Sequence, residues 1–190
     1  MQQLALIVEK GKILTFQIRS RKVCFWPCSV LADRAIVLSE KGESIMQAET
    51  MWEQFIAGQP SPPERYEAWA FGASADELAK LVLEGKKTAT ASAYDLYVKV
   101  GEPLPKEGEY SVILDGAGEA VCIICTSKVY VVPFCEVSAV QAYKEGEGDR
   151  SLAYWRKVHW DFFTRAFAKQ GLVFDENSKV VCEEFEVVYR

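Results

Sequence analysis

The chain has little histidine and no long hydrophobic run. Its single histidine, His159, excludes the paired histidines of common zinc motifs. No segment approaches the roughly 20 consecutive apolar residues of a membrane-spanning helix. The short run Leu4–Val8 is followed at once by Glu9 and Lys10, too early for a secretory signal. We therefore expect a cytoplasmic protein that does not bind membranes.

The six cysteines also lack a zinc-binding pattern. Cys122 and Cys125 have the spacing of a metal knuckle, but they lie in a run typical of a strand, residues 121–126. Residues three apart in a strand point to opposite faces, so these two thiols cannot share one zinc ion. The chain has no second Cys-x-x-Cys pair. We expect buried, reduced thiols, and neither a metal nor another cofactor.

The net charge of −5 is unevenly distributed. Residues 1–45 carry +3 and residues 46–190 carry −8. An acidic domain disfavours tight, sequence-independent binding of long nucleic acid, which depends on many phosphate contacts. The acidic charge does not exclude a local basic groove or a small nucleoside ligand.

The first 45 residues differ from the rest in having no clear apolar period. Codons for Lys41–Ile45 can spell an adenine-rich tract containing GGAG, at the distance from the Met46 codon that is typical of a bacterial ribosome-binding site. Our hypothesis is that residues 1–45 are a non-native leader or disordered extension and that residues 46–190 are the domain. The alternative is a genuine hairpin with strands near 4–8 and 13–18. An intact mass of the native gene product that matched all 190 residues would end the leader hypothesis.

Strands dominate the domain, with helices inserted between them. No repeated strand–helix–strand rhythm appears, which argues against a parallel α/β sheet. The pattern therefore predicts an α+β fold, a small mixed β-barrel with inserted helices. Asp115–Gly118 is typical of a hairpin turn. We expect helices near 52–57, 75–84, 137–144 and 150–169, and strands near 88–94, 110–114, 119–132 and 180–189.

The segment Gly85–Ser92 is the most informative part of the chain. Ser74 and Glu77 fit a capping box at the start of the preceding helix, and Gly85 suits the left-handed position at its end. The following strand alternates hydroxyls and alanines. One face carries Thr88, Thr90, Ser92 and Tyr94, and the other carries Ala89, Ala91 and Ala93.

A row of hydroxyls beside Lys86 and Lys87 can hold an anion or activate an alcohol. Strand alternation places Lys86, and not Lys87, on the face of Thr90 unless the chain bends after Gly85. A structural interpretation also stands, because threonine is a good strand former and lysines suit the end of a helix.

Three acids, Glu145, Glu147 and Asp149, alternate with glycines before the long helix. We expect Asp149 to be the N-cap of that helix. Like charges held close together raise a carboxyl pKa, which can make a glutamate a proton donor. The alternative is three solvated acids at a helix N-terminus.

His159 and Trp155 lie on the apolar stripe of the long helix, while Arg150 lies beside it. A lone histidine on such a stripe predicts a hydrogen-bonded core residue rather than a catalyst. Trp155 could stack on a base, although an aromatic at helical spacing is usually core. Arg150 could contact phosphate.

Together these segments resemble the ASCH family, a PUA-like β-barrel superfamily linked to RNA metabolism. The similarity covers roughly residues 60–190, and each motif is weak alone. The matching pieces are residues 85–90, 133–134, 145–152, 155–156, 159, 162–163 and 181–189.

The resemblance implies an activity, because some small members of this family remove the acetyl group from N4-acetylcytidine with a lysine, a threonine and a glutamate. By motif these are Lys87, Thr90 and Glu145. The implied roles are Thr90 as nucleophile, Lys87 as proton acceptor and Glu145 as proton donor, without a metal. Those amidohydrolases have an arginine where this chain has Ser92. The residues expected to contact the substrate are Lys86, Ser92, Tyr94, Arg150 and Trp155.

Other members of the family bind RNA or act as ribonucleases. The alternative function is therefore a non-catalytic RNA-binding module, or a ribonuclease, with a lysine-lined cleft. The expected partner is a nucleoside or a short RNA, with no DNA implied. The oligomeric state is left open.

Overall fold

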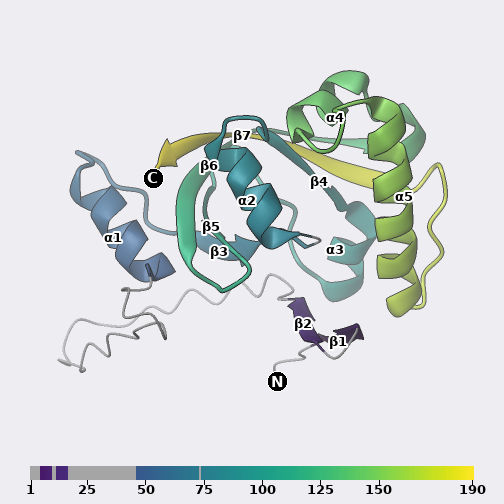
Figure 1. Cartoon of the computed structure of the whole chain (residues 1–190), viewed down its shortest axis with the longest axis horizontal. Helices are drawn as coiled ribbons and strands as arrows, with labels where there is room; N and C mark the ends of the chain where they lie inside the picture. The colour runs from purple at the N-terminus through teal and green to yellow at the C-terminus, as the bar shows by residue number, and fades with distance from the viewer. Residues whose placement is uncertain (1–4, 10–11, 17–45, 73) are drawn as a thin grey trace.

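A curled five-stranded sheet forms the centre of the molecule in the computed structural model (Figure 1). The structure describes residues 5–9, 12–16, 46–72 and 74–190. The helices are α1 (Ala48–Ala57), α2 (Ala75–Leu83), α3 (Tyr94–Val100), α4 (Ala139–Glu145) and α5 (Leu152–Lys169), with a 3₁₀ turn, η1 (Phe134–Glu136). The strands of the sheet are β3 (Glu67–Ala70), β4 (Ala89–Ala93), β5 (Tyr110–Leu114), β6 (Ala120–Pro133) and β7 (Lys179–Tyr189).

The sheet has the order β3-β5-β6-β7-β4. β3 pairs parallel with β5, and the other neighbours are antiparallel. The pairing of β6 with β7 shifts register at Ile123/Ile124 and again at Thr126/Lys128. Such irregularities bend and twist a strand, which accounts for the curl. The α+β, barrel-like fold predicted from the sequence is confirmed.

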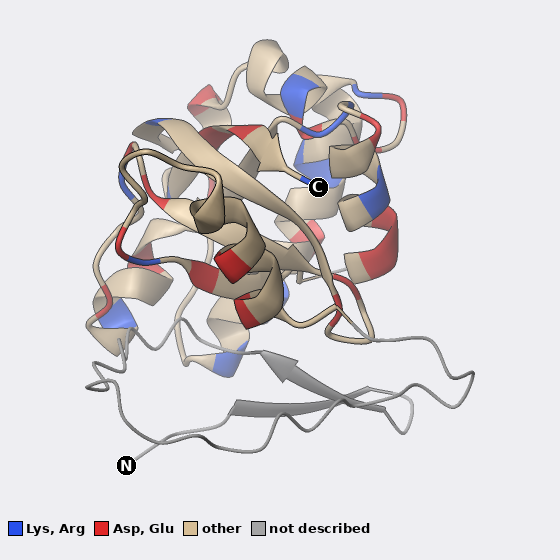
Figure 2. Ribbon diagram, turned by 90° about the vertical axis from the view of Figure 1, so that its left-hand side faces the viewer, with Lys and Arg blue, Asp and Glu red and all other residues tan. Residues whose placement is uncertain are grey.

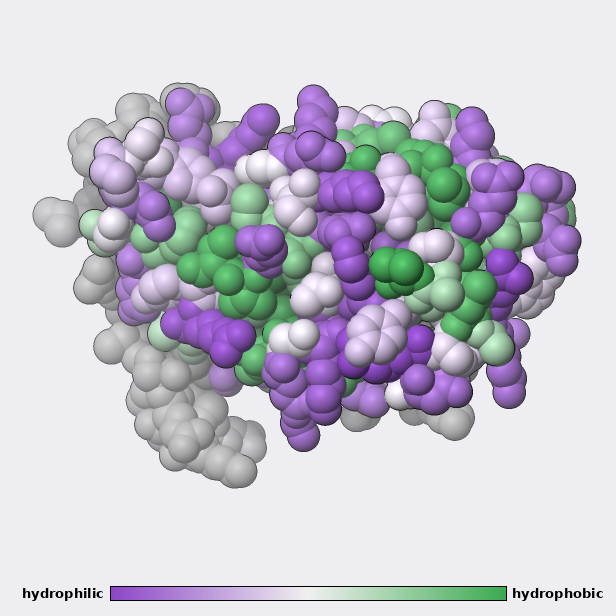
Figure 3. All heavy atoms as spheres, turned by 90° about the horizontal axis from the view of Figure 1, so that it is seen from above, coloured by the Kyte–Doolittle hydropathy of each residue, from purple (hydrophilic) through white to green (hydrophobic). Residues whose placement is uncertain are grey.

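Helices cover both faces of the sheet, because its central strands alternate buried residues between two cores. Val112 and Ile123 pack with α1, whereas their neighbours Ile113 and Ile124 pack with α2. A third core lies between α5 and the start of β7, where Val180 is fully buried. Seen from above, apolar side chains reach the surface in separate patches among polar ones (Figure 3). Within the described chain, no helix combines the length and apolar character needed to span a membrane.

The strand with the alternating hydroxyls ends one residue earlier than expected. Tyr94 begins α3, a short helix that the sequence analysis missed. α3 has no fully buried residue, so its apolar pattern is weak. It ends at Gly101, which has φ 71° in the left-handed region.

Two cap predictions are wrong. Ser74 is the N-cap of α2, but its side chain makes no capping hydrogen bond. At α5 the N-cap is Ser151, whose hydroxyl accepts from the Tyr154 N–H at 3.1 Å. Asp149 instead accepts from the Ser151 N–H at 2.9 Å, which tightens the turn before the helix.

Near the N-terminus, β1 (Ala5–Glu9) and β2 (Lys12–Phe16) pair as an antiparallel hairpin, the arrangement that the alternative to the leader hypothesis describes. Most of the segment in question, residues 17–45, lies outside the described residues. The start at Met46 therefore stays a hypothesis. In the described part of the chain, Cys122, Cys125, Cys135 and Cys182 are free thiols; Cys122 and Cys182 are buried and Cys135 is exposed.

Candidate active site

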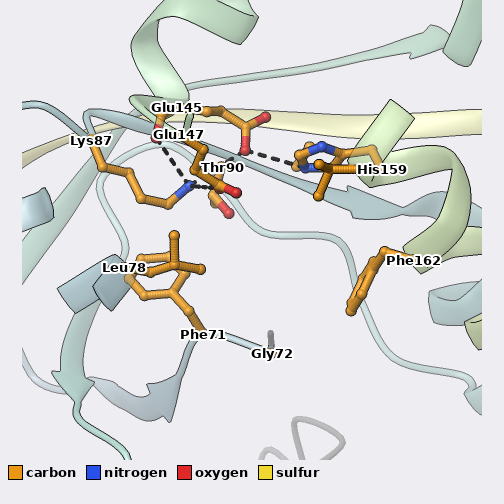
Figure 4. A pocket seen from close by; sticks show the side chains of 11 residues that line it. Phe71, Gly72, Leu78, Lys87, Thr90, Glu145, Glu147, His159 and Phe162 are labelled. Carbon is orange, nitrogen blue, oxygen red and sulfur yellow. Dashed lines mark hydrogen bonds and ion pairs between the residues drawn. The ribbon is translucent and has the colours of Figure 1, made fainter. Parts of the chain in front are cut away.

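A pocket of about 70 Å³ lies where the start of β4, the end of α4 and the middle of α5 meet (Figure 4). One part of its wall is polar and the other is apolar. The lining residues are Phe71, Gly72, Leu78, Lys87, Thr90, Ala91, Glu145, Glu147, Val158, His159 and Phe162.

Lys87 reaches this pocket because the chain bends after α2. Gly85 has φ 69°, and the N–H groups of both Lys86 and Lys87 donate to the Leu81 carbonyl. A bend after Gly85 was the condition for Lys87, and not Lys86, to lie on the same side as Thr90, and this bend meets it. The simple strand alternation, which favoured Lys86, is wrong because β4 begins only at Ala89.

Glu145 reaches the pocket as the last residue of α4. The next residue, Gly146, has φ 77°, and a Cβ placed there would lie 2.5 Å from the carbonyl oxygen of Lys86. The N–H of Thr88 donates to the carbonyl of Lys144 at 2.8 Å. The end of α4 is thus pressed against the bend, which brings Glu145 to Lys87 across 58 positions of sequence.

The Glu145 carboxylate receives four polar contacts. Its Oε1 accepts from the Trp155 indole N–H at 2.7 Å and from Gln141 Nε2 at 3.2 Å. Its Oε2 lies 3.4 Å from Lys87 Nζ and 3.4 Å from His159 Nε2 (Figure 4). A carboxylate has about four acceptor sites, so this group is fully satisfied although its side chain is only 1% exposed.

These contacts decide the protonation state of Glu145. Burial alone would raise its pKa, but the Lys87 ammonium, His159 and the Trp155 N–H together lower the pKa to about 2. The raised pKa that was expected from the neighbouring acids is therefore wrong. Hydrogen-bond donors surround the carboxyl group, so it is a carboxylate at neutral pH.

Lys87 is held by three acceptors. Its Nζ lies 3.0 Å from Glu147 Oε1 and 3.4 Å from both Oε2 and the backbone oxygen of Glu145. An ammonium group has three N–H donors, so these contacts use all of them. The side chain is 1% exposed, and Nζ lies 5.1 Å from the centre of the Phe71 ring.

Glu145, Glu147 and His159 offer ligand atoms within 4.8 Å of one another, the only such group of possible metal ligands among the described residues. Lys87 Nζ contacts both of these carboxylates. A metal ion could bind here only by displacing the ammonium group. The geometry therefore favours an ion pair over a metal centre.

His159 is buried and hydrogen-bonded, as expected of a core residue, and it also lines the pocket. Its Nδ1 lies 3.0 Å from the Trp155 carbonyl oxygen, and its ring stacks on the Trp155 ring at 4.1 Å. The sequence holds one signal for this position. His159 follows Trp155 by one helical turn, so both side chains lie on the same face of α5, and both contact Glu145.

Thr90 lines the same pocket, and its backbone carbonyl accepts from Gln141 Nε2 at 3.1 Å. Gln141 is buried, and its side-chain oxygen accepts from the Tyr130 hydroxyl at 3.1 Å. It thereby ties β4 to Glu145, four residues later on α4. Neither the role of Gln141 nor the ion pair of Glu147 was predicted from the sequence.

The structure brings Lys87, Thr90 and Glu145 together, but the five residues expected to contact the substrate do not line this pocket. Lys86 is exposed and pairs with Glu84 at 2.8 Å. Trp155 is buried and acts as a donor to Glu145.

The other three face neighbours of their own. Ser92 Oγ lies 3.0 Å from the Tyr97 hydroxyl. Tyr94 lies under Lys179, whose Nζ is 5.1 Å from the ring centre. Arg150 stacks on a surface tyrosine, with its guanidinium 3.7 Å from the ring centre.

These features define a class of small α+β domains, with a curled sheet and a buried lysine–carboxylate pocket at its edge. The family model described as the ASCH domain matches residues 67–189. The chain belongs to the ASCH domain family, which is generally RNA-related.

Two solved structures are similar over most of the domain. The ASCH domain from Lactobacillus crispatus JV V101 is 33% identical, with a TM-score of 0.72, and the match covers 75% of this chain and 94% of that one. Protein EF3133 from Enterococcus faecalis V583, of the DUF984 family, is 37% identical, with a TM-score of 0.66, over 74% of this chain and 87% of that one. Comparison with the curated proteins gives no match.

Proposed function

We propose that this protein is a metal-independent amidohydrolase that acts on N4-acylated cytidine nucleosides. The observation that supports it is the buried ion pair of Lys87 and Glu145 in a pocket that Thr90 also lines. Two charged groups are costly to bury. A domain that keeps them beside a hydroxyl, in the wall of a pocket, has the parts needed for acyl transfer.

In the proposed reaction the Thr90 hydroxyl attacks the amide carbonyl and the Glu145 carboxylate accepts the hydroxyl proton. The Lys87 ammonium stabilises the carbonyl oxygen as it becomes negative. These assignments exchange the proton roles that the family resemblance implies for Lys87 and Glu145. The reason is that Glu145, with a pKa of about 2, is a carboxylate that accepts hydrogen bonds and holds no proton to give.

A substrate oxygen must replace one of the three acceptors on Lys87. Glu147 is the partner that can leave, because its side chain is 19% exposed while that of Glu145 is 1% exposed. Moving Glu147 aside also opens the pocket. Its present volume of about 70 Å³ is half that of a cavity that holds benzene, so it takes the acyl-amide end alone. The base and sugar would lie toward Phe162 and Gly72 at the rim.

The proposal is tested by the release of cytidine from N4-acetylcytidine at saturating substrate. Thr90→Ala should lower kcat by at least about 100-fold, because it removes the nucleophile. Thr90→Ser keeps a hydroxyl at the same position and should retain measurable turnover. Wild-type protein that released no cytidine, or an alanine variant as fast as wild type, would reject the proposal.

The alternative, a lysine-lined cleft for RNA, has less support. Lys86 and Lys144 pair with Glu84 and Glu184, and Lys87 is buried. Acidic and basic residues are interspersed along the ribbon in Figure 2 and do not separate into one basic face. Binding of short RNAs that weakened steeply with salt would favour this alternative.

A further inference from the structure

The contacts of His159 fix where one of its protons lies. Nδ1 faces the carbonyl oxygen of Trp155 at 3.0 Å. A carbonyl oxygen can only accept a hydrogen bond, so Nδ1 must carry a hydrogen and donate it. In a neutral imidazole the other nitrogen, Nε2, would then be a bare acceptor.

Nε2, however, faces another acceptor. It lies 3.4 Å from Oε2 of Glu145, which the surrounding donors keep as a carboxylate. Two acceptors facing each other in a buried site repel, whereas a proton between them makes the contact favourable. The geometry therefore requires a hydrogen on Nε2 as well.

The balance of charge points to the same state. The charged groups that face His159 come from the end of α4, the loop after it and the bend before β4, and they are Glu145, Glu147 and Lys87. Two carboxylates and one ammonium leave one negative charge in a site that is largely closed to water. A second ring proton on His159 neutralises it. The Trp155 ring stacked against the imidazole at an interplanar angle of 14° also favours a cation.

We propose that His159 holds this second proton against Glu145 and delivers it to the leaving nitrogen of the amide. The first half, the position of the proton, stands on geometry alone. The second half, its delivery, rests on the proposed amidohydrolase function. It supplies a donor for the leaving nitrogen, since the proton that Glu145 takes from Thr90 returns to Thr90 and the three donors of Lys87 are engaged.

Acylation and deacylation each move one proton through Glu145 and one through His159. The oxygen of Thr90 bonds to the carbonyl carbon, and its proton passes to Glu145. The C–N bond breaks, and the leaving nitrogen takes the proton from Nε2 of His159, giving a free amine and an acyl ester on Thr90. Water then attacks the ester and gives a proton to Nε2, while Glu145 returns its proton to the oxygen of Thr90. Acetic acid leaves and the site is restored.

The position of the proton can be measured without any assay, because His159 is the single histidine of the chain. In full-length protein freed of any histidine tag, ¹⁵N chemical shifts of the imidazole report whether one or both ring nitrogens are protonated. At pH 7 we expect both to be protonated in wild type and only Nδ1 in Glu145→Gln, where the carboxylate is gone. A wild-type ring with one bare nitrogen would overturn this part.

The delivery of the proton is tested with two variants that separate positioning from proton transfer. In His159→Gln the side-chain amide stands in for Nε2–H and can still donate to Glu145, but it cannot give up a proton. His159→Asn stands in for Nδ1–H only. If His159 merely positions Glu145, His159→Gln should keep wild-type turnover and His159→Asn should not.

If His159 delivers the proton, His159→Gln should lower kcat on N4-acetylcytidine by about 100-fold or more, with KM changed less than threefold. On 4-nitrophenyl acetate, whose leaving group needs no proton, the initial burst of 4-nitrophenolate, which reports acylation of Thr90 alone, should stay within about threefold of wild type in the same variant. Wild-type kcat on the amide in His159→Gln would overturn the delivery step. A wild type without amidohydrolase activity would overturn it together with the proposed function, and the ¹⁵N measurement would still decide where the proton lies.

Discussion

At the scale of single residues, Glu145 shows how burial and charge compete. Its carboxyl group is almost wholly removed from water, which would normally favour the protonated form. Four donors reverse this, and the charged form is the stable one. The consequence is that Glu145 contributes to the dependence of folding on pH.

We expect the stability advantage of wild type over Glu145→Gln to fall as the solution is acidified. The folded pKa of Glu145, about 2, lies below its ordinary value of 4.5, so the unfolded state binds more protons in acid. The contribution is complete above pH 4.5 and is lost as the pH falls toward 2. Its full size is on the order of 3 kcal/mol, of which about 2 kcal/mol should be gone by pH 3.

Urea unfolding at pH 6 and pH 3 measures this difference. The comparison of the two proteins cancels the other carboxyl groups whose pKa is lowered by ion pairing or hydrogen bonding, Glu84, Asp149 and Glu184. A gap between wild type and variant that stayed constant over this range would show that Glu145 is not held as a carboxylate.

At the scale of elements, the site is a junction of two chain reversals. The bend after α2 carries Lys87, and the end of α4 carries Glu145. Gly146 lets these two segments touch, since its φ of 77° and its missing side chain leave room for the backbone of Lys86. The position therefore needs a glycine for two separate reasons.

Gly146→Ala should destabilise the protein more than the left-handed backbone alone explains. A side chain in that region costs about 1–2 kcal/mol. The added Cβ would also lie 2.5 Å from the oxygen of Lys86, and relieving such a contact costs about 1–3 kcal/mol more. The shift would move Glu145 away from Lys87, so amidohydrolase activity should fall as well.

Gly101 provides the matched control. It also ends a helix with φ 71°, but a Cβ there would meet nothing within 4 Å. Gly101→Ala should therefore lose only the strain, with activity unchanged. Equal losses in the unfolding free energy of the two variants, measured by urea, would contradict the close approach inferred at Gly146.

Regular elements were predictable from the sequence where a periodic pattern decides them. β5, β6 and β7 contain runs of consecutive buried residues, and α5 has a continuous apolar stripe. α3 was missed because seven residues without a fully buried side chain give no clear period. The caps were mistaken because several nearby oxygens could serve, and the turn geometry chose between them.

At the scale of the whole molecule, the sequence could name Lys87, Thr90 and Glu145 through family resemblance, but not their protonation. That depends on Trp155 and His159, which lie on the neighbouring helix and meet Glu145 only after α4 and α5 pack together. Long-range packing of this kind leaves no local pattern.

At the same scale, the three hydrophobic cores bear on where the domain begins. The three described cores draw their members from residues 46–189, and the ASCH match covers residues 67–189. We expect a chain of residues 46–190 to fold with the same site, because α1 and the whole five-stranded sheet are retained.

The midpoint of thermal unfolding of this shorter chain should lie within about 2 °C of the full chain, a difference of under about 1 kcal/mol for a domain of this size. Calorimetry of both chains measures the midpoint, and the histidine ¹⁵N shifts serve as a control for the site. A truncated chain that unfolded many degrees lower would show that residues 1–45 stabilise the domain, and it would count against their being a translated leader.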